Sequence, residues 1–228
     1  MTYKTILLDF DDTIVDFYDA EEKAFYNMAK HFNHYPTKDD FYHFRKVNQS
    51  HWEAFQENKL TKEEVLTQRF VNYFKDYQIE VDGKQADHIF RDELAKAKPS
   101  FFDDTLETID YLRGNHNIYI VTNGVTETQQ RRIAQTTFNE TLNGIYISEQ
   151  TGFQKPMPEF FDYIFKEIGE QQRESAIIVG DSLTSDILGG YNARIATCWF
   201  NLRGKENQTS IQPDYEIKSF KELIHIVE

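Results

Sequence analysis

The sequence predicts an α/β protein with a Rossmann-like parallel-sheet core and an inserted all-helical cap. After Pro99, short apolar runs alternate with amphipathic helices, which is the pattern of a parallel sheet built from right-handed crossovers. Between the first apolar run and Pro99 lie four amphipathic helices and no strand pattern. We therefore expect residues 1–15 and 99–228 to form the core and residues 16–98 to form the cap.

The chain opens with the apolar run Thr5-Ile6-Leu7-Leu8, which is followed by Asp9-Phe10-Asp11-Asp12-Thr13. An apolar run that stops at acids is typical of a buried parallel strand whose carboxyl end presents carboxylates. Acids crowded in one place repel one another unless a cation neutralises them or one is protonated. The motif therefore predicts metal-binding or acid–base chemistry. The alternative for these residues alone is an acidic turn that caps the next helix.

The cap helices are predicted from their starts and their apolar stripes. Three of them begin at patterns typical of helix N-termini, namely Asp19 with Glu22, Thr37, and Thr61 with Glu64. The fourth carries Ile89, Phe90 and Leu94 on one face and ends near Pro99.

In the core, helices are expected at residues 105–113, 128–136 and 158–168 and strands at residues 118–121, 144–148, 176–179, 195–200 and 215–217. Parallel strands point the same way, so the polar residues at their ends converge on one edge of the sheet. These residues are Asp9, Asp11 and Thr13; Thr122 and Asn123; and Asp181, Ser182 and Asp186. Lys155, in the loop before a helix, can join them.

The composition limits the partners and the compartment. With 39% hydrophobic and 15% aromatic residues, the chain is not disordered, and a net charge of −13 disfavours a nucleic-acid polymer or an anionic membrane as partner. A small phosphorylated ligand fits if a metal and a lysine reverse the field locally. Cys198 is the only cysteine, and residues 1–4 resemble neither a signal peptide nor a membrane span. We expect a cytoplasmic protein, although a secreted one without disulfides would have a similar composition.

The motifs resemble those of the haloacid dehalogenase superfamily over nearly the whole chain. Its four motifs correspond to Asp9-x-Asp11-x-Thr13, Thr122-Asn123, Lys155-Pro156, and Gly180-Asp181 followed by Asp186. A helical cap inserted between the first two motifs is the arrangement of the subgroup with a four-helix-type cap. The resemblance implies a Mg²⁺-dependent phosphomonoesterase.

The resemblance also implies a role for each motif residue. Asp9 would be the nucleophile that forms an aspartyl-phosphate, and Asp11 would protonate the leaving oxygen. Thr122, Asn123 and Lys155 would bind phosphate oxygens, and Thr13 is counted among the substrate-binding residues. For Mg²⁺ the predicted ligands are Asp9, Asp181 and the backbone carbonyl of Asp11, with Asp186 orienting water or Lys155 at the same metal site.

Within the superfamily, the chain is most similar to pyrimidine 5'-nucleotidases. This closer similarity rests on Val47-Asn48, Trp52, Thr61, Arg69-Phe70, Thr122-Asn123-Gly124 and Gln129-Gln130-Arg131. Asn48 falls within an aromatic stripe, so one interpretation is that Asn48 reads a base edge while Trp52 stacks nearby. The alternative is a buried Asn48 bonded to backbone or one tilted to solvent. The expected substrate is a nucleoside monophosphate.

Other reactions fit parts of the same pattern. A phosphatase for another small sugar phosphate would have the same core motifs. A 2-haloacid dehalogenase uses a similar aspartate to attack carbon, but Asp11 argues against it because carbon–halogen cleavage needs no acid for an oxygen leaving group. A catalytically silent binding module is disfavoured by the joint presence of Asp9, Asp11, Lys155 and Asp181.

Overall fold

The computed structural model describes residues 2–228, which divide into two compact units. Residues 2–17 and Pro99–Glu228 form one unit, here called the core, and Tyr18–Lys98 forms the other, the cap. The sequence places the start of the cap at residue 16. In the structure, β2 (Val15–Asp16) pairs antiparallel with β3 (Ser100–Phe101), so both strands belong to the core. Strands of two residues are too short to show the alternation from which strands are predicted.

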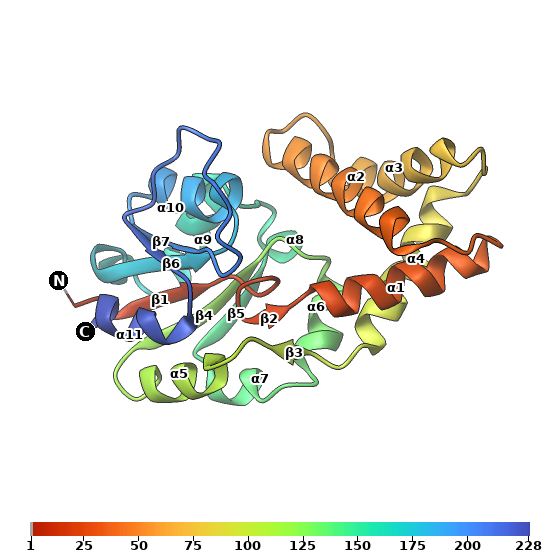
Figure 1. Cartoon of the computed structure of the whole chain (residues 1–228). Helices are drawn as coiled ribbons and strands as arrows, with labels where there is room; N and C mark the ends of the chain where they lie inside the picture. The colour runs from red at the N-terminus through yellow and green to blue at the C-terminus, as the bar shows by residue number, and fades with distance from the viewer. Residues whose placement is uncertain (1) are drawn as a thin grey trace. The chain divides into compact units, whose positions relative to one another are not determined.

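The core is built on a six-stranded sheet with the order β5-β4-β1-β6-β7-β8 (Figure 1). All pairings are parallel, which confirms the predicted fold class. The strands are β1 (Thr5–Leu8), β4 (Asn117–Thr122), β5 (Gly144–Ile147), β6 (Ala176–Gly180), β7 (Ala196–Phe200) and β8 (Tyr215–Ile217). Strand β1 lies between β4 and β6, where the direction of winding reverses, and ligands of open α/β sheets bind at such switch points.

Alternation along β1 creates two hydrophobic layers, because Ile6 and Leu8 face one side of the sheet and Leu7 faces the other. The first side packs against α5 (Thr105–Leu112), α6 (Thr126–Ile133), α7 (Phe138–Thr141) and α11 (Leu223–Val227). The second packs against α9 (Pro158–Ile168) and α10 (Leu188–Ala193). The remaining short elements are α8 (Ser148–Thr151), η1 (Glu170–Ser175), η2 (Leu183–Ile187) and η3 (Phe220–Glu222). The core is therefore a three-layer sandwich, with α5 and α9 on opposite sides of the sheet in Figure 1.

The cap consists of the four helices α1 (Tyr18–His31), α2 (Lys38–Gln56), α3 (Lys62–Asp76) and α4 (Gly83–Lys96). Thr37 and Thr61 are N-caps with complete capping boxes, as their patterns predict. The predicted N-cap at Asp19 is wrong, because α1 begins at Tyr18 and Asp19 lies in its first turn. An acid is favourable in either position, so the residue type alone does not separate them.

Aromatic packing holds the cap together. Phe25 stacks on Phe44 with ring centroids 4.6 Å apart, and Phe44 stacks on Phe70 at 5.6 Å. All three rings are fully buried, and they come from α1, α2 and α3. Such pairs contribute about 0.5–1.5 kcal/mol each beyond the burial of their area. The aromatic stripes of the sequence are thus the interior of the cap.

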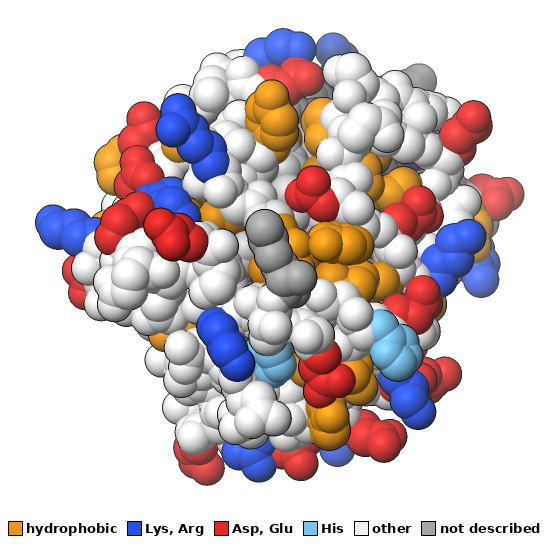
Figure 2. Space-filling view, turned by 90° about the vertical axis from the view of Figure 1, so that its left-hand side faces the viewer, with side chains coloured by type: hydrophobic (Ala, Val, Ile, Leu, Met, Phe, Trp, Pro, Cys, Tyr) orange, Lys and Arg blue, Asp and Glu red, His pale blue; other side chains and the backbone are white. Residues whose placement is uncertain are grey.

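The surface is charged and of mixed sign. On the face in Figure 2, acidic and basic side chains are interspersed around hydrophobic ones, so the acidic excess is not gathered there into a single patch. Among the described residues, 2–228, no helix has the length and hydrophobicity needed to cross a bilayer.

Candidate active site

The carboxyl ends of three neighbouring strands bring the motif residues together. Asp9 follows β1, Thr122 is the last residue of β4, and Asp181 follows β6. Since β4 and β6 flank β1 in parallel register, these residues lie side by side at one edge of the sheet. The predicted convergence therefore follows directly from the topology.

Lys155 is the centre of this cluster. Its Nζ donates hydrogen bonds to Asp9 Oδ1 at 2.6 Å, to Asp186 Oδ1 at 2.7 Å and to the carbonyl oxygen of Val121 at 2.8 Å. The side chain is only 1% exposed. All three ammonium protons therefore have acceptors, and one positive charge joins the carboxylates that follow β1 and β6.

Burial and charge shift the pKa values in this cluster. Burial would lower the pKa of Lys155, but the neighbouring charges of Asp186 and Asp9 outweigh it, and the net pKa is raised. Burial raises the pKa of Asp9 to about 7, because it outweighs the opposing effect of Lys155 and is reinforced by the charge of Asp186. An additional cation would favour the ionised form of Asp9.

Asn123 holds the loop that carries Lys155. Its Nδ2 donates to the carbonyl of Lys155 at 2.8 Å, and the backbone N–H of Lys155 donates to Asn123 Oδ1 at 2.9 Å. This reciprocal pair fixes the backbone of a residue 32 positions away in the chain. The phosphate contact that the sequence predicts for Asn123 stays a prediction. The sequence did not predict that the Asn123 side chain holds Lys155 in place.

Asp186 supports Lys155 from the helical turn after β6. Its Oδ1 accepts from Lys155, its Oδ2 accepts from the backbone N–H of Ser182 at 3.1 Å, and the residue is 1% exposed. A Cβ atom at Gly180 would lie 2.2 Å from the Asp186 carboxyl group, so the close approach requires glycine there. Asp186 is thus well placed to orient Lys155.

Thr13 does not have the accessibility expected of a substrate-binding side chain. The residue is completely buried, and its hydroxyl donates to Asp9 Oδ2 at 3.4 Å. That Thr13 binds substrate stays a prediction; in the structure its side chain contacts Asp9. The spacing of the motif predicts that Thr13 lies in the site, but it does not predict the direction of the Thr13 hydroxyl.

The Asp11 carboxylate is bound by two residues of α6. Gln129 Nε2 donates to Asp11 Oδ2 at 2.8 Å, and Arg132 Nη1 donates to Asp11 Oδ1 at 2.5 Å. Gln129 was expected only as part of the similarity to pyrimidine 5'-nucleotidases, and Arg132 was not predicted as a site residue. A signal was present, because α6 reads Thr-Glu-Thr-Gln-Gln-Arg-Arg-Ile and a helix so polar can be buried only against polar partners.

Three carboxylates are placed to hold a metal ion. Asp9, Asp181 and Asp186 each offer one oxygen, and these oxygens all lie within 4.8 Å of one another. Burial raises the pKa of Asp181 well above its usual value, and the charge of Asp12 raises it further. Buried carboxylates that lie close together are stabilised by a cation. Because all the ligand atoms are oxygens, the site fits a hard divalent cation such as Mg²⁺.

Asn48 and Trp52, the two cap residues predicted to bind substrate, both contact other side chains of the cap. Asn48 is 8% exposed; its Nδ2 donates to Glu21 Oε1 at 2.8 Å, and its Oδ1 accepts from Arg69 at 2.9 Å. The Trp52 ring has the Lys62 ammonium 4.9 Å from its centroid. Asn48 is therefore buried and bonded to two charged side chains. The sequence had suggested bonding to the backbone or exposure to solvent as the alternatives to a base contact. The prediction that Asn48 and Trp52 contact a base has no support from these contacts.

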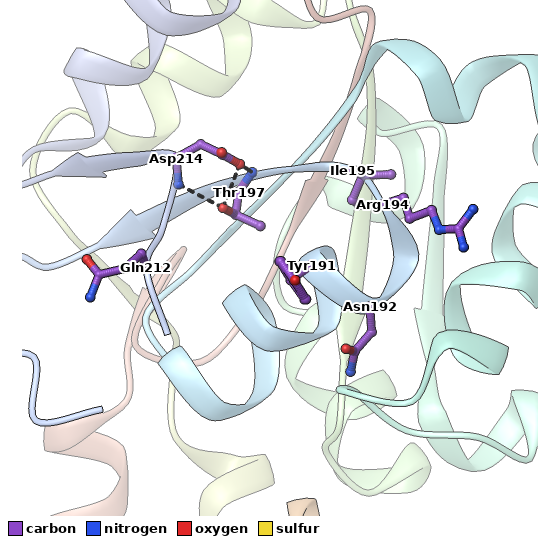
Figure 3. A pocket seen from close by; sticks show the side chains of 7 residues that line it. All are labelled: Tyr191, Asn192, Arg194, Ile195, Thr197, Gln212 and Asp214. Carbon is purple, nitrogen blue, oxygen red and sulfur yellow. Dashed lines mark hydrogen bonds between the residues drawn. The ribbon is translucent and has the colours of Figure 1, made fainter. Parts of the chain in front are cut away.

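A pocket of about 530 Å³ lies at the opposite edge of the sheet (Figure 3). Its lining includes Tyr191 and Arg194 at the end of α10 and Thr197 near the start of β7. Asp214 Oδ2 accepts from both the backbone N–H and the hydroxyl of Thr197 at 2.9 Å. None of the motif residues lines this pocket, because they lie at the carboxyl ends of the strands.

The comparison with known proteins agrees with this geometry. Residues 3–194 match the haloacid dehalogenase-like hydrolases, a range that includes all four motifs. The chain belongs to this hydrolase family. It is 40% identical to YfnB of Bacillus subtilis over 99% of this chain and 95% of that protein. The crystal structure of YfnB bound to magnesium has a TM-score of 0.94 and 39% identity, with 100% of both chains covered.

Two further relatives of this haloacid dehalogenase-like hydrolase are pyrimidine 5'-nucleotidases. PynA of Streptococcus pneumoniae is 32% identical over 98% of this chain and 94% of that protein. YjjG of Escherichia coli is 30% identical over 98% of this chain and 97% of that protein. The resemblance seen in the motifs is therefore confirmed, both for the family and for the similarity to pyrimidine 5'-nucleotidases.

Proposed function

We propose that this hydrolase is a Mg²⁺-dependent phosphomonoesterase that acts on pyrimidine nucleoside 5'-monophosphates through an aspartyl-phosphate. The assignment to this reaction class rests on one observation. The Asp9 carboxylate lies at the switch point of the sheet, 2.6 Å from a buried ammonium and within an all-oxygen cluster, while a second carboxylate, Asp11, follows two residues later. A nucleophile, positive charge and an acid are the groups that phosphoryl transfer requires.

In the first step, an Asp9 oxygen attacks phosphorus and the bond between phosphorus and the nucleoside oxygen breaks. Asp11 gives its proton to that oxygen, so the nucleoside leaves as an alcohol. In the second step, water attacks the phosphorus of the aspartyl-phosphate, Asp11 takes a proton from the water, and Asp9 is released as a carboxylate. Thr122 and Lys155 stabilise the phosphate oxygens by hydrogen bonding and charge.

The metal would be held by Asp9 and Asp181, together with the backbone carbonyl of Asp11. Asp186 is the third carboxylate of the cluster; it accepts hydrogen bonds from Lys155 and from the backbone N–H of Ser182, and in this proposal it orients Lys155. When bound, Mg²⁺ would neutralise the carboxylates and polarise the phosphoryl group.

The substrate class rests on the relatives. Two proteins that are 32% and 30% identical over nearly the full length are pyrimidine 5'-nucleotidases. The N-acylneuraminate-9-phosphatases of mouse and human match only 53% of this chain. The similarity to the nucleotidases extends over the cap as well as the core, and this favours a nucleotide over another sugar phosphate.

We expect purified protein with Mg²⁺ to release phosphate fastest from pyrimidine nucleoside 5'-monophosphates in a panel of phosphate esters. The panel would contain purine nucleotides, hexose phosphates, an acyl-sugar phosphate and a 2-haloacid, with detection of phosphate and of halide. A preference for a sugar phosphate would overturn the nucleotide assignment alone. Halide release without phosphate release would overturn the phosphatase assignment.

We expect Mg²⁺ to bind more weakly as the pH falls from about 8 to about 6. Burial raises the pKa of Asp9 to about 7 and raises that of Asp181, so below neutral pH the cation must displace protons from its ligands. The affinity should fall about tenfold per pH unit for each proton displaced. Titration calorimetry in two buffers of different ionisation enthalpy counts those protons. An affinity that is constant over this range, without proton release, would contradict the assigned ligands.

A further inference from the structure

The carboxylate assigned as the acid is held at both of its oxygens. Gln129 Nε2 donates to Asp11 Oδ2 at 2.8 Å, and Arg132 Nη1 donates to Asp11 Oδ1 at 2.5 Å. Two donors on two different oxygens fix both the position and the rotation of a carboxyl group. Each oxygen keeps a second lone pair, so the fixed group can still carry or accept a proton.

The two donors are rigid because they also bind each other. Gln129 and Arg132 are one helical turn apart on α6, each is 2% exposed, and Arg132 Nη1 donates to Gln129 Oε1 at 3.0 Å. The Arg132 guanidinium also lies 5.1 Å from the ring centroids of Phe10 and Phe17. These contacts leave the guanidinium little rotational freedom.

Burying this arginine is costly for the fold. Its Nε is buried and has no hydrogen-bond partner within residues 2–228. An unsatisfied buried donor costs about 1–3 kcal/mol, and such exceptions in folded proteins require an explanation. A role in the reaction of Asp11 provides one, since the same guanidinium contacts the carboxylate directly.

Gln129 also connects Asp11 to the phosphate-binding hydroxyl. Its Nε2 donates to Thr122 Oγ at 2.9 Å, and the backbone N–H of Gly124 donates to the same oxygen at 3.1 Å. With two donors already received, the Thr122 hydroxyl is left to donate its own hydrogen to a substrate oxygen. A Cβ at Gly124 would lie 2.5 Å from Gln129 Cδ, so glycine there leaves room for this side chain.

We propose that Gln129 and Arg132 are positioning residues that fix the Asp11 carboxyl group for proton transfer, and that Gln129 also orients the Thr122 hydroxyl toward the phosphate. This inference rests on the proposed phosphomonoesterase function. Each residue acts through Asp11 or Thr122 and does not touch the substrate. A purely structural role for the pair would change folding stability without distinguishing between leaving groups.

The test compares Gln129→Leu and Arg132→Met with the wild type in single-turnover experiments on two substrates. A nucleoside 5'-monophosphate has a poor alkoxide leaving group that needs the proton, whereas nitrophenyl phosphate has a good one that does not. We expect the cleavage rate of the nucleotide to fall at least about tenfold more than that of nitrophenyl phosphate in both variants. Loss of the Thr122 orientation should raise KM in Gln129→Leu for both esters alike, because both carry the same phosphate.

The neighbouring exposed residues of α6 provide matched controls. Gln130→Leu and Arg131→Met make the same chemical changes on the exposed face of the helix, and we expect wild-type rates for both. Urea unfolding of each variant reports whether the fold is retained. If Arg132→Met does not fold, Gln129→Leu alone decides, since it removes no charge.

Asp11→Asn, measured in parallel, separates the two possible failures. If Asp11→Asn shows the leaving-group difference and both Gln129→Leu and Arg132→Met lose rate equally on the two esters, the positioning role is overturned while the acid role stands. If Asp11→Asn itself slows both esters equally, Asp11 is not the acid, and Gln129 and Arg132 have no proton transfer to support. A leaving-group difference in all three variants supports both assignments.

Discussion

Replacing Asp9 with asparagine is expected to reduce phosphate release by at least about 10³-fold, because an amide cannot attack phosphorus and is a poor ligand for Mg²⁺. The same change should leave the free energy of unfolding within about 1–2 kcal/mol of the wild type. Burial raises the pKa of Asp9 to about 7, so the metal-free fold gains little from its negative charge. Phosphate release and urea unfolding, measured on one preparation, check both parts.

Asp110→Asn is the matched control, because Asp110 is an exposed carboxylate of α5 in the same unit of the protein. It should retain wild-type turnover. Activity of Asp9→Asn within a few-fold of the wild type, at equal purity, would exclude Asp9 as the nucleophile. Loss of activity together with a large loss of stability would instead assign Asp9 a structural role.

Replacing Lys155 with methionine is expected to destabilise the core by about 3–5 kcal/mol and to abolish turnover. The change leaves the buried carboxyl groups of Asp9 and Asp186 without the ammonium that bonds to both at 2.6 and 2.7 Å. Without the lysine, the pKa of Asp9 should rise above its value of about 7, so the carboxylate becomes neutral more readily. The loss in unfolding free energy should therefore be larger near pH 8 than near pH 6.

Denaturant midpoints at the two pH values measure this difference. Lys166→Met, on the exposed face of α9, is the control and should change the unfolding free energy by no more than about 0.5 kcal/mol. A Lys155→Met variant as stable as the wild type at both pH values would mean that the ammonium does not hold the two carboxylates together.

The fold was largely predictable because strand and helix patterns agree with one another along the core. The run Thr5–Leu8 is β1, Ala176–Gly180 is β6, and the N-caps Thr37 and Thr61 begin α2 and α3 as expected. The two-residue strands β2 and β3 were missed, since two residues show no periodicity. Their pairing depends on residues 15 and 101 meeting, which is a tertiary event.

The site was predictable as a set of residues but not as a set of contacts. Strand ends place Asp9, Thr122 and Asp181 together in any parallel sheet of this order. Side-chain direction is a different matter: Thr13 bonds Asp9, Asn123 holds the Lys155 loop, and both depend on rotamers. A sequence pattern does not specify these contacts.

For Arg132 a site role was missed, and for Asn48 a site role was predicted that its contacts do not support. Arg132 was missed because arginine on a polar helix is usually solvated, and only the packing of α6 against Phe10 shows that it is buried. Asn48 was given a substrate role because it interrupts an aromatic stripe, yet Glu21 and Arg69 within the cap satisfy it. Buried polar residues are identified by their partners, and those partners come from other helices.

Covalent catalysis by Asp9 can be measured in the Asp11→Asn variant with Mg²⁺. The measurement is the early time course of nitrophenol release from nitrophenyl phosphate. The good leaving group departs without an acid, but hydrolysis of the aspartyl-phosphate still lacks its base. We expect a burst of about one nitrophenol per active site, with the phosphate retained on Asp9 and located there by peptide mapping. Linear release without a burst, with free phosphate appearing in step with nitrophenol and no phosphate on Asp9, would exclude Asp9 as a covalent nucleophile.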